Sequence, residues 1–146
     1  MCFTLYMASD NECPMSSWDK DAPAFYVERQ EGTGALFYGG LDTKFSTKYW
    51  YYLGSSEGCG CGFSQADDIK YPDFTEREGI RKNQQDLFSY ISKCLENETF
   101  IELYGCWAGS ETRKSYTRRE IKVQEIVNED FFFAEDELIT VRKLRR

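Results

Sequence analysis

The chain has 146 residues, of which 41% are hydrophobic, 16% are aromatic and 29% are charged, and its formal net charge is −7. This length and composition predict a single globular domain over residues 1–146 and argue against a membrane-spanning or disordered chain. The negative charge disfavours unspecific binding to nucleic acid or to anionic membranes, because both require a positive field.

The sequence contains six cysteines and no histidine. Without histidine, the chain cannot form a Ser-His-Asp triad, a Cys-His dyad or a metal site that depends on histidine ligands. The first residues, MCFTLYMAS, lack the basic and long apolar regions of an export signal and are typical of a first strand instead. We therefore expect a cytoplasmic protein whose thiols are free, bound to metal or redox-active.

The first half of the chain is predicted to consist of strands and irregular segments. Residues 2–8 alternate between two apolar faces, as in a strand that is covered on both sides. A loop at 9–23 and a short strand at 24–29 follow, and the glycines of 31–40 predict turns around another short strand. The aromatic residues of 48–53 predict a strand; they could also stack on a base or sugar, but a buried central strand is the more usual arrangement.

The second half contains the clearest helix. Thr75 and Glu78 form a capping-box pattern, and apolar residues then recur at helical spacing, which predicts a helix over about 75–96. Strands are expected at 99–107, at 118–123 as its hairpin partner, and at 138–141, whereas 123–128 also fits one helical turn. This order predicts an α+β fold: a mostly antiparallel sheet of about six strands with one principal helix packed on a face.

The segment 54–63, GSSEGCGCGF, is the first candidate site, because its four glycines raise the entropic cost of folding and are hard to explain by packing alone. Its first half matches the G-x-S-x-G pattern of a nucleophile elbow. That motif requires a histidine base, which this chain lacks, and a helix after the serine, where we expect a loop. A serine hydrolase is therefore excluded.

The segment 51–55, YYLGS, is similar to the second half of the GIY-YIG nuclease signature. The first half of that signature is not properly present. The family's helix arginine would have to be Arg81, and its metal-binding glutamate Glu96 or Glu102. Because the chain is also acidic, such a nuclease is retained only as a minor alternative.

Cys59 and Cys61 could bind a metal or form a strained, easily reduced disulfide if their sulfurs converge. The sequence leaves their directions open, because the surrounding glycines make a regular strand improbable. A structural zinc would need two more thiolates from Cys2, Cys13, Cys94 and Cys106, of which we expect Cys106 to be the third sulfur. No positively charged residue adjoins either loop cysteine, which disfavours a reactive thiolate.

The loop could also be a binding nest, in which backbone N–H groups converge on an anion or a partner carboxylate. Our leading hypothesis is a non-catalytic domain that binds a ligand or protein partner through Ser55, Ser56, Glu57, Gly58, Cys59, Gly60, Cys61 and Gly62. The alternative is a thiol-dependent redox or metal-binding protein that uses Cys59 and Cys61. The sequence identifies neither a cofactor nor a partner.

Four segments of the chain resemble a family of small bacterial proteins of no established activity. These segments are MCFTLYMAS, YYLGSSEGCGCGF, FIELYGCW and EDFFFAEDELITV, so the resemblance extends over most of the chain. It implies a single bacterial cytosolic domain, and it implies no catalytic residue.

Overall fold

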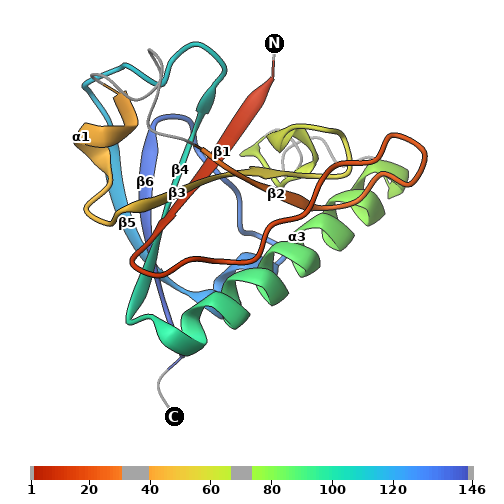
Figure 1. Cartoon of the computed structure of the whole chain (residues 1–146). Helices are drawn as coiled ribbons and strands as arrows, with labels where there is room; N and C mark the ends of the chain where they lie inside the picture. The colour runs from red at the N-terminus through yellow and green to blue at the C-terminus, as the bar shows by residue number, and fades with distance from the viewer. Residues whose placement is uncertain (1, 31–39, 67–73, 145–146) are drawn as a thin grey trace.

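The computed structural model describes residues 2–30, 40–66 and 74–144, and it contains one sheet of six strands in the order β2-β3-β1-β4-β6-β5 (Figure 1). All neighbouring strands are antiparallel except β5 and β6, which are parallel. The α+β fold with a mostly antiparallel sheet is therefore confirmed. The strands are β1 (Phe3–Ser9), β2 (Tyr26–Arg29), β3 (Tyr49–Gly54), β4 (Phe100–Trp107), β5 (Thr117–Lys122) and β6 (Glu137–Arg142).

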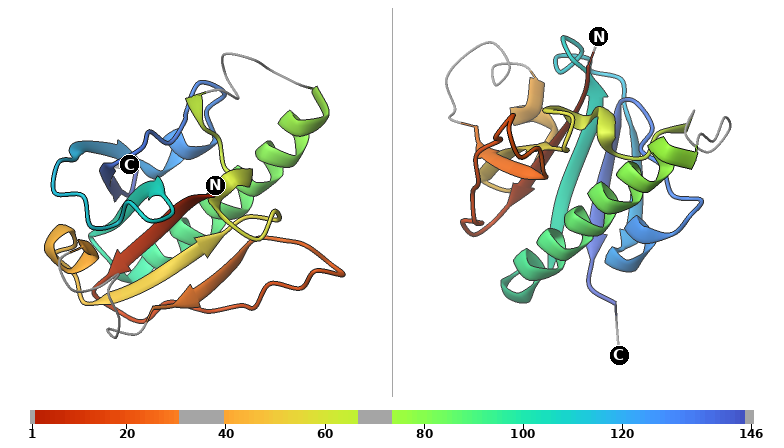
Figure 2. Two further views of the ribbon diagram at one scale, coloured as in Figure 1. Left: turned by 90° about the horizontal axis from the view of Figure 1, so that it is seen from above. Right: turned by 90° about the vertical axis from the view of Figure 1, so that its right-hand side faces the viewer.

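The principal helix, α3 (Phe74–Cys94), lies obliquely across one face of the sheet and ends in the short 3₁₀ helix η3 (Leu95–Asn97) (Figure 2). Its apolar stripe is buried as expected, with Leu87, Ile91 and Leu95 in the main core. The predicted helix at 75–96 is thus confirmed. The side chain of Thr75, and most of the segment 31–40 in which we expect turns and a short strand, lie outside the described residues.

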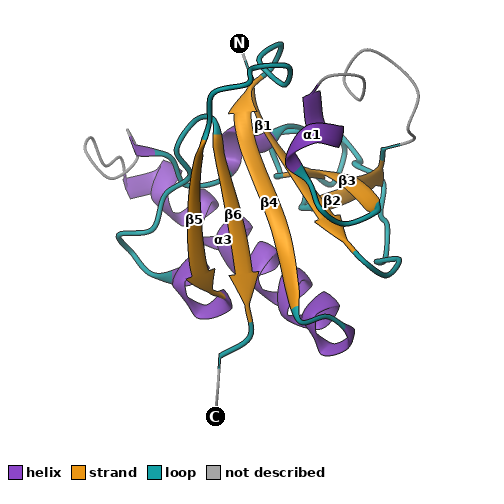
Figure 3. Cartoon of the chain, turned by 90° about the vertical axis from the view of Figure 1, so that its left-hand side faces the viewer, coloured by secondary structure: helices purple, strands orange, loops and turns teal. Residues whose placement is uncertain are grey.

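The strand β1 is the centre of the sheet, and all seven of its residues are buried. Phe3, Leu5 and Met7 belong to the core between the sheet and α3. Tyr6 and Ala8 belong to a second cluster on the other face, which the residues around the short helix α1 (Asp42–Lys44) partly cover (Figure 3). The two apolar faces predicted for residues 2–8 are therefore both used.

The expected hairpin between 99–107 and 118–123 is wrong. β4 pairs with β6, and β5 pairs with the other edge of β6 in parallel, with Arg119 opposite Ile139. Burial explains this arrangement: β6 buries Leu138, Ile139 and Val141 between two neighbours, whereas β5 has the sequence TRREIK and buries only Ile121. A charged strand is suited to the sheet edge.

The ambiguous segment after β5 forms the 3₁₀ helix η4 (Val123–Val127), which packs beside α3. Among the described residues, no helix has both the length and the apolar character needed to cross a membrane.

Candidate functional site

The segment 54–63 leaves the end of β3, folds back over the start of β1 and contains the 3₁₀ helix η2 (Gly60–Gly62). Ser55, which is fully buried, holds the fold of this loop. Its hydroxyl donates to the carbonyl of Cys59 at 2.5 Å and accepts from the N–H groups of Glu57 at 3.2 Å and Gly62 at 3.0 Å. Ser55 is therefore committed to the structure of the loop.

Asn83 of α3 anchors the same loop to the helix. Its side-chain amide donates to the Ser56 hydroxyl at 3.0 Å and to the Gly62 carbonyl at 3.2 Å, and its oxygen accepts from the Ser56 N–H at 3.0 Å. Asn83 is buried, so these bonds compensate its lost hydration. The loop is thus fixed from two sides, by its own serine and by the helix.

The glycines of the loop are needed for close packing, contrary to the expectation from sequence. A Cβ on Gly60 would come within 2.7 Å of the Phe3 carbonyl oxygen, and one on Gly62 within 2.4 Å of the Ser55 hydroxyl. Gly54 leaves room for the ring of Tyr26, and Gly58 has a φ of +85°, which L side chains rarely adopt. The glycines therefore allow the loop to pack directly against β1.

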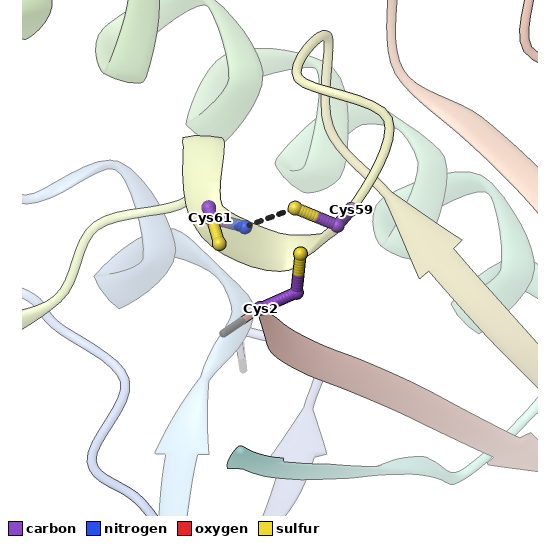
Figure 4. Close-up of side chains that lie close together, drawn as sticks. All are labelled: Cys2, Cys59 and Cys61. Carbon is purple, nitrogen blue, oxygen red and sulfur yellow. Dashed lines mark hydrogen bonds between the residues drawn. The ribbon is translucent and has the colours of Figure 1, made fainter. Parts of the chain in front are cut away.

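This packing brings together three sulfurs from two distant parts of the chain (Figure 4). The Sγ atoms of Cys2, Cys59 and Cys61 all lie within 4.8 Å of one another. Cys2 directly precedes β1 and is exposed, while the two loop cysteines are half-buried, and all three are free thiols. The sulfurs of the C-G-C segment therefore converge, which answers the question that the sequence left open.

Two backbone N–H groups donate to sulfurs of this cluster. The N–H of Cys61 donates to Cys59 Sγ at 3.4 Å, as drawn in Figure 4, and the N–H of Phe3 donates to Cys61 Sγ at 3.2 Å. Such bonds stabilise negative charge on sulfur and orient its lone pairs. At Cys59 the backbone thus favours the thiolate form, because the N–H of Cys61 lowers the pKa of that thiol.

Burial works against that charge. It raises the pKa of the Cys59 thiol to about 12; the N–H of Cys61 lowers it, and the neighbouring thiols of Cys61 and Cys2 raise it further. Tyr26, whose hydroxyl donates to the Gly58 carbonyl at 2.6 Å, lies close by and contributes no positive charge. Cys59 is therefore protonated at neutral pH unless a cation replaces the proton.

Cys106, expected as the third sulfur, lies elsewhere, and Cys2 takes that place. Cys106 is fully buried in the second core cluster, with its Sγ 3.4 Å from the Thr4 hydroxyl. Its backbone pairs with Thr4, which follows Cys2 by two residues in the chain. The sequence includes Cys2 among four candidate ligands but gives no reason to prefer it, because the contact depends on β1 running beneath a loop more than fifty residues away, for which there is no local signal.

Most of the loop amides that a binding nest would use are already engaged. Seven of them donate to acceptors within the chain: those of Ser55, Ser56, Glu57, Gly58, Cys61, Gly62 and Phe63. The loop therefore offers its thiols to a ligand more readily than its backbone.

The residues considered for a nuclease have separate structural partners. Tyr51 is buried in the core, and its hydroxyl accepts from the N–H of Cys13 at 2.8 Å. Arg81 pairs with Glu129 at 3.1 Å, whereas Glu102 is buried on β4 and accepts four hydrogen bonds from Ser46 and Thr47. These contacts give no support to a shared nuclease site.

Comparison of the chain with protein-family models, with curated proteins and with solved structures gave no match. The resemblance to a bacterial family described above therefore stays an expectation, and the geometry of the cysteine cluster is the evidence for function.

Proposed function

We propose that this protein binds a thiophilic metal ion through the sulfurs of Cys2, Cys59 and Cys61. The observation that carries the proposal is the convergence of these sulfurs within 4.8 Å of one another. Thiolate ligands select soft or borderline ions such as Cu(I) and Zn(II) over Mg(II) or Ca(II). We therefore infer that the ligand of residues 54–63 is a metal ion.

The spacing of the sulfurs suits such an ion. A Zn–S bond of about 2.3 Å in a tetrahedral site places sulfurs about 3.8 Å apart, so these three would move together by about 1 Å or less. Three thiolates complete a trigonal Cu(I) site. Zn(II) would need a fourth ligand, and because Cys2 is exposed, water could supply it. The expected centre is therefore open to solvent on one side.

Electrostatics favour a metal over a nucleophilic thiol. The raised pKa of Cys59 keeps this group protonated at neutral pH, and a protonated thiol is a poor attacking group. A bound cation supplies positive charge, which none of the described groups that shift the pKa of Cys59 provides, and it displaces the proton of that thiol. A reducing cytoplasm is the compartment in which the three thiols would stay available.

Metal titration of the full-length, reduced protein under anaerobic conditions tests the proposal. We expect one Cu(I) or Zn(II) per chain, measured in competition with a chromophoric chelator. Cys2→Ser, at an exposed position, should weaken binding at least about tenfold, and so should Cys59→Ser and Cys61→Ser. Cys106→Ser is the matched control, because its hydroxyl can still bond to Thr4 and its position is outside the cluster.

Two results would refute the metal site. One is the absence of stoichiometric binding by the reduced protein, and the other is unchanged affinity in the Cys2→Ser protein. A disulfide between Cys2 and a loop cysteine, formed under mild oxidation in a protein that binds no metal, would instead favour the redox alternative.

A further inference from the structure

A second pair of cysteines lies at the other end of β1. Cys13 follows β1 in the loop that leads to β2, and Cys94 is the last residue of α3. Both side chains belong to the main core and line one cavity, and the thiol of each is the largest influence on the pKa of the other. Because β1 has seven residues, it separates this pair from the cluster of Cys2, Cys59 and Cys61 by roughly 20 Å.

The pair is accessible despite its burial. Cys13 and Cys94 line a cavity of about 230 Å³, which is also bordered by the exposed residues Glu12, Lys93 and Glu96. A water molecule occupies about 30 Å³ of the liquid, so a hydroperoxide has room to reach the sulfurs. Neither thiol is therefore sealed in the core.

The surroundings of the two thiols give them different roles. Hydrogen bonding from Cys94 lowers the pKa of the Cys13 thiol, burial raises it, and the Ser9 hydroxyl, 3.4 Å from Cys13 Sγ, lowers it. The same hydrogen bond raises the pKa of Cys94, which is also raised by burial. The pKa of Cys13 is thus the lower of the two, so the Cys13 thiol, which donates to the Asn11 carbonyl at 3.6 Å, loses its proton more readily than Cys94.

The backbone at Cys13 is held by hydrogen bonds to two tyrosines. The N–H of Cys13 donates to the hydroxyl of Tyr51 on β3 at 2.8 Å. The next residue, Pro14, accepts a hydrogen bond from the hydroxyl of Tyr90 on α3 at 2.8 Å. These two bonds hold the loop against the end of the helix that carries Cys94.

We propose that Cys13 and Cys94 form a peroxide-sensitive pair that closes to a disulfide and so ties the loop after β1 to the end of α3. The Cys13 thiolate attacks one oxygen of hydrogen peroxide, the O–O bond breaks, and the leaving hydroxide takes up a proton to become water. Cys13 is then a sulfenic acid. The Cys94 sulfur attacks the Cys13 sulfur and displaces hydroxide, which takes the Cys94 proton. Two thiols and one peroxide thus give one disulfide and two waters.

Peptide mapping of the intact, folded protein tests this directly. Cleavage after glutamate separates the relevant cysteines: Cys2 lies in peptide 1–12, Cys13 in 13–28, Cys94 in 79–96 and Cys106 in 103–111. After treatment with hydrogen peroxide and blocking of free thiols, we expect peptides 13–28 and 79–96 to be joined, with a mass two hydrogens below their sum. The reductant-treated sample should release both peptides.

Single variants separate the two roles. In Cys94→Ser, Cys13 should accumulate as a sulfenic acid that dimedone traps, whereas in Cys13→Ser, Cys94 should stay a free thiol. The proposal is overturned if the treated wild-type protein lacks the 13–28 to 79–96 link, or if Cys94 is oxidised as readily in Cys13→Ser as in the wild type. Neither result depends on metal binding, because the proposed metal ligands are in other peptides.

Discussion

Gly60 lies so close to Phe3 that a Cβ on the glycine would come within 2.7 Å of the Phe3 carbonyl oxygen. Gly60 separates Cys59 from Cys61, and Phe3 is the neighbour of Cys2 in the chain. This contact therefore sets the distance between the loop and the strand that together hold the three sulfurs.

Gly60→Ala should consequently damage both stability and metal binding. The added methyl group meets backbone atoms, which cannot swing aside as a flexible side chain would, so the loop must lift from β1. We expect a loss of about 1–3 kcal/mol in the free energy of unfolding. We also expect metal affinity to fall at least about tenfold, because the sulfurs separate. Denaturant unfolding and chelator competition measure the two effects.

Gly79→Ala is the matched control, since Gly79 is exposed within α3 and a Cβ there would meet nothing within 4 Å. Alanine is a better helix former than glycine, so this change should stabilise the protein by about 0.5–1 kcal/mol. Its metal affinity should equal that of the wild type. Normal metal binding by Gly60→Ala would show that the loop contact does not set the sulfur positions.

A second prediction concerns Glu102, a buried carboxylate on β4. One of its oxygens, Oε1, accepts from the backbone N–H and hydroxyl groups of Ser46, at 2.9 and 3.0 Å, and of Thr47, at 3.2 and 3.0 Å. Glu102→Ala leaves these buried donors without their acceptor, and we expect it to cost about 2–4 kcal/mol of unfolding free energy. Glu102→Gln should cost less, because the amide oxygen can still accept.

Glu120→Ala provides the comparison for that experiment. Glu120 is on the edge strand β5 and forms an exposed ion pair with Arg142. Such surface pairs contribute about 0–1 kcal/mol, so its removal should change stability little. If Glu102→Ala is as mild as Glu120→Ala in chemical denaturation, the buried hydrogen bonds of Glu102 are not a main support of the sheet.

Local signals in the sequence were enough to predict the elements that bury a regular face. The stripe containing Leu87 and Ile91 predicted α3, and the alternation in 2–8 predicted β1. The pairing of β5 was not predictable in this way, because a parallel partner that comes later in the chain leaves no turn signal between the two strands.

The candidate site was predicted only in part for a related reason. Two of its sulfurs, Cys59 and Cys61, stand out because of the unusual C-G-C spacing. The third, Cys2, is identifiable only once the loop is known to pack on β1. From sequence alone the glycines of the loop indicate a ligand site, whereas the structure needs them for that packing.

The buried tyrosines provide a third prediction. Burial raises the pKa of six described tyrosines, namely Tyr6, Tyr26, Tyr51, Tyr52, Tyr90 and Tyr104. Since the folded state favours the neutral phenol, this contribution to stability is complete below about pH 10 and is lost as the pH rises above it. In ultraviolet titration, fewer than the ten tyrosines of the chain should ionise before alkaline unfolding.

Tyr6→Phe tests one of these groups individually. The Tyr6 hydroxyl donates to Glu111 Oε2 at 3.0 Å, so its removal should cost about 1–3 kcal/mol and reduce the number of late-ionising tyrosines by one. Ionisation of all ten tyrosines near pH 10 in the folded protein would contradict the buried environment of the Tyr6 hydroxyl.

The pH dependence of metal binding is the fourth prediction, and its sign follows from Cys59. With a pKa of about 12, this thiol is protonated at neutral pH, so the metal must displace its proton. Affinity should therefore rise with pH, by about tenfold per pH unit for the proton that Cys59 releases. The free energy of unfolding of the metal-free protein should instead fall as the pH rises. The raised pKa of Cys59 contributes stability that is complete below about pH 8.5 and is lost at higher pH.

Competition titrations between about pH 6.5 and 7.5 measure this slope. In Cys59→Ser the remaining metal affinity should depend less steeply on pH, because one proton fewer is released on binding. In Cys106→Ser the pH dependence of the affinity should equal that of the wild type. A metal affinity that does not change with pH would mean that the ion is held by groups already deprotonated at neutral pH, such as the exposed carboxylates, and not by the three thiols. The slope therefore distinguishes thiolate ligation from adventitious binding to an acidic surface.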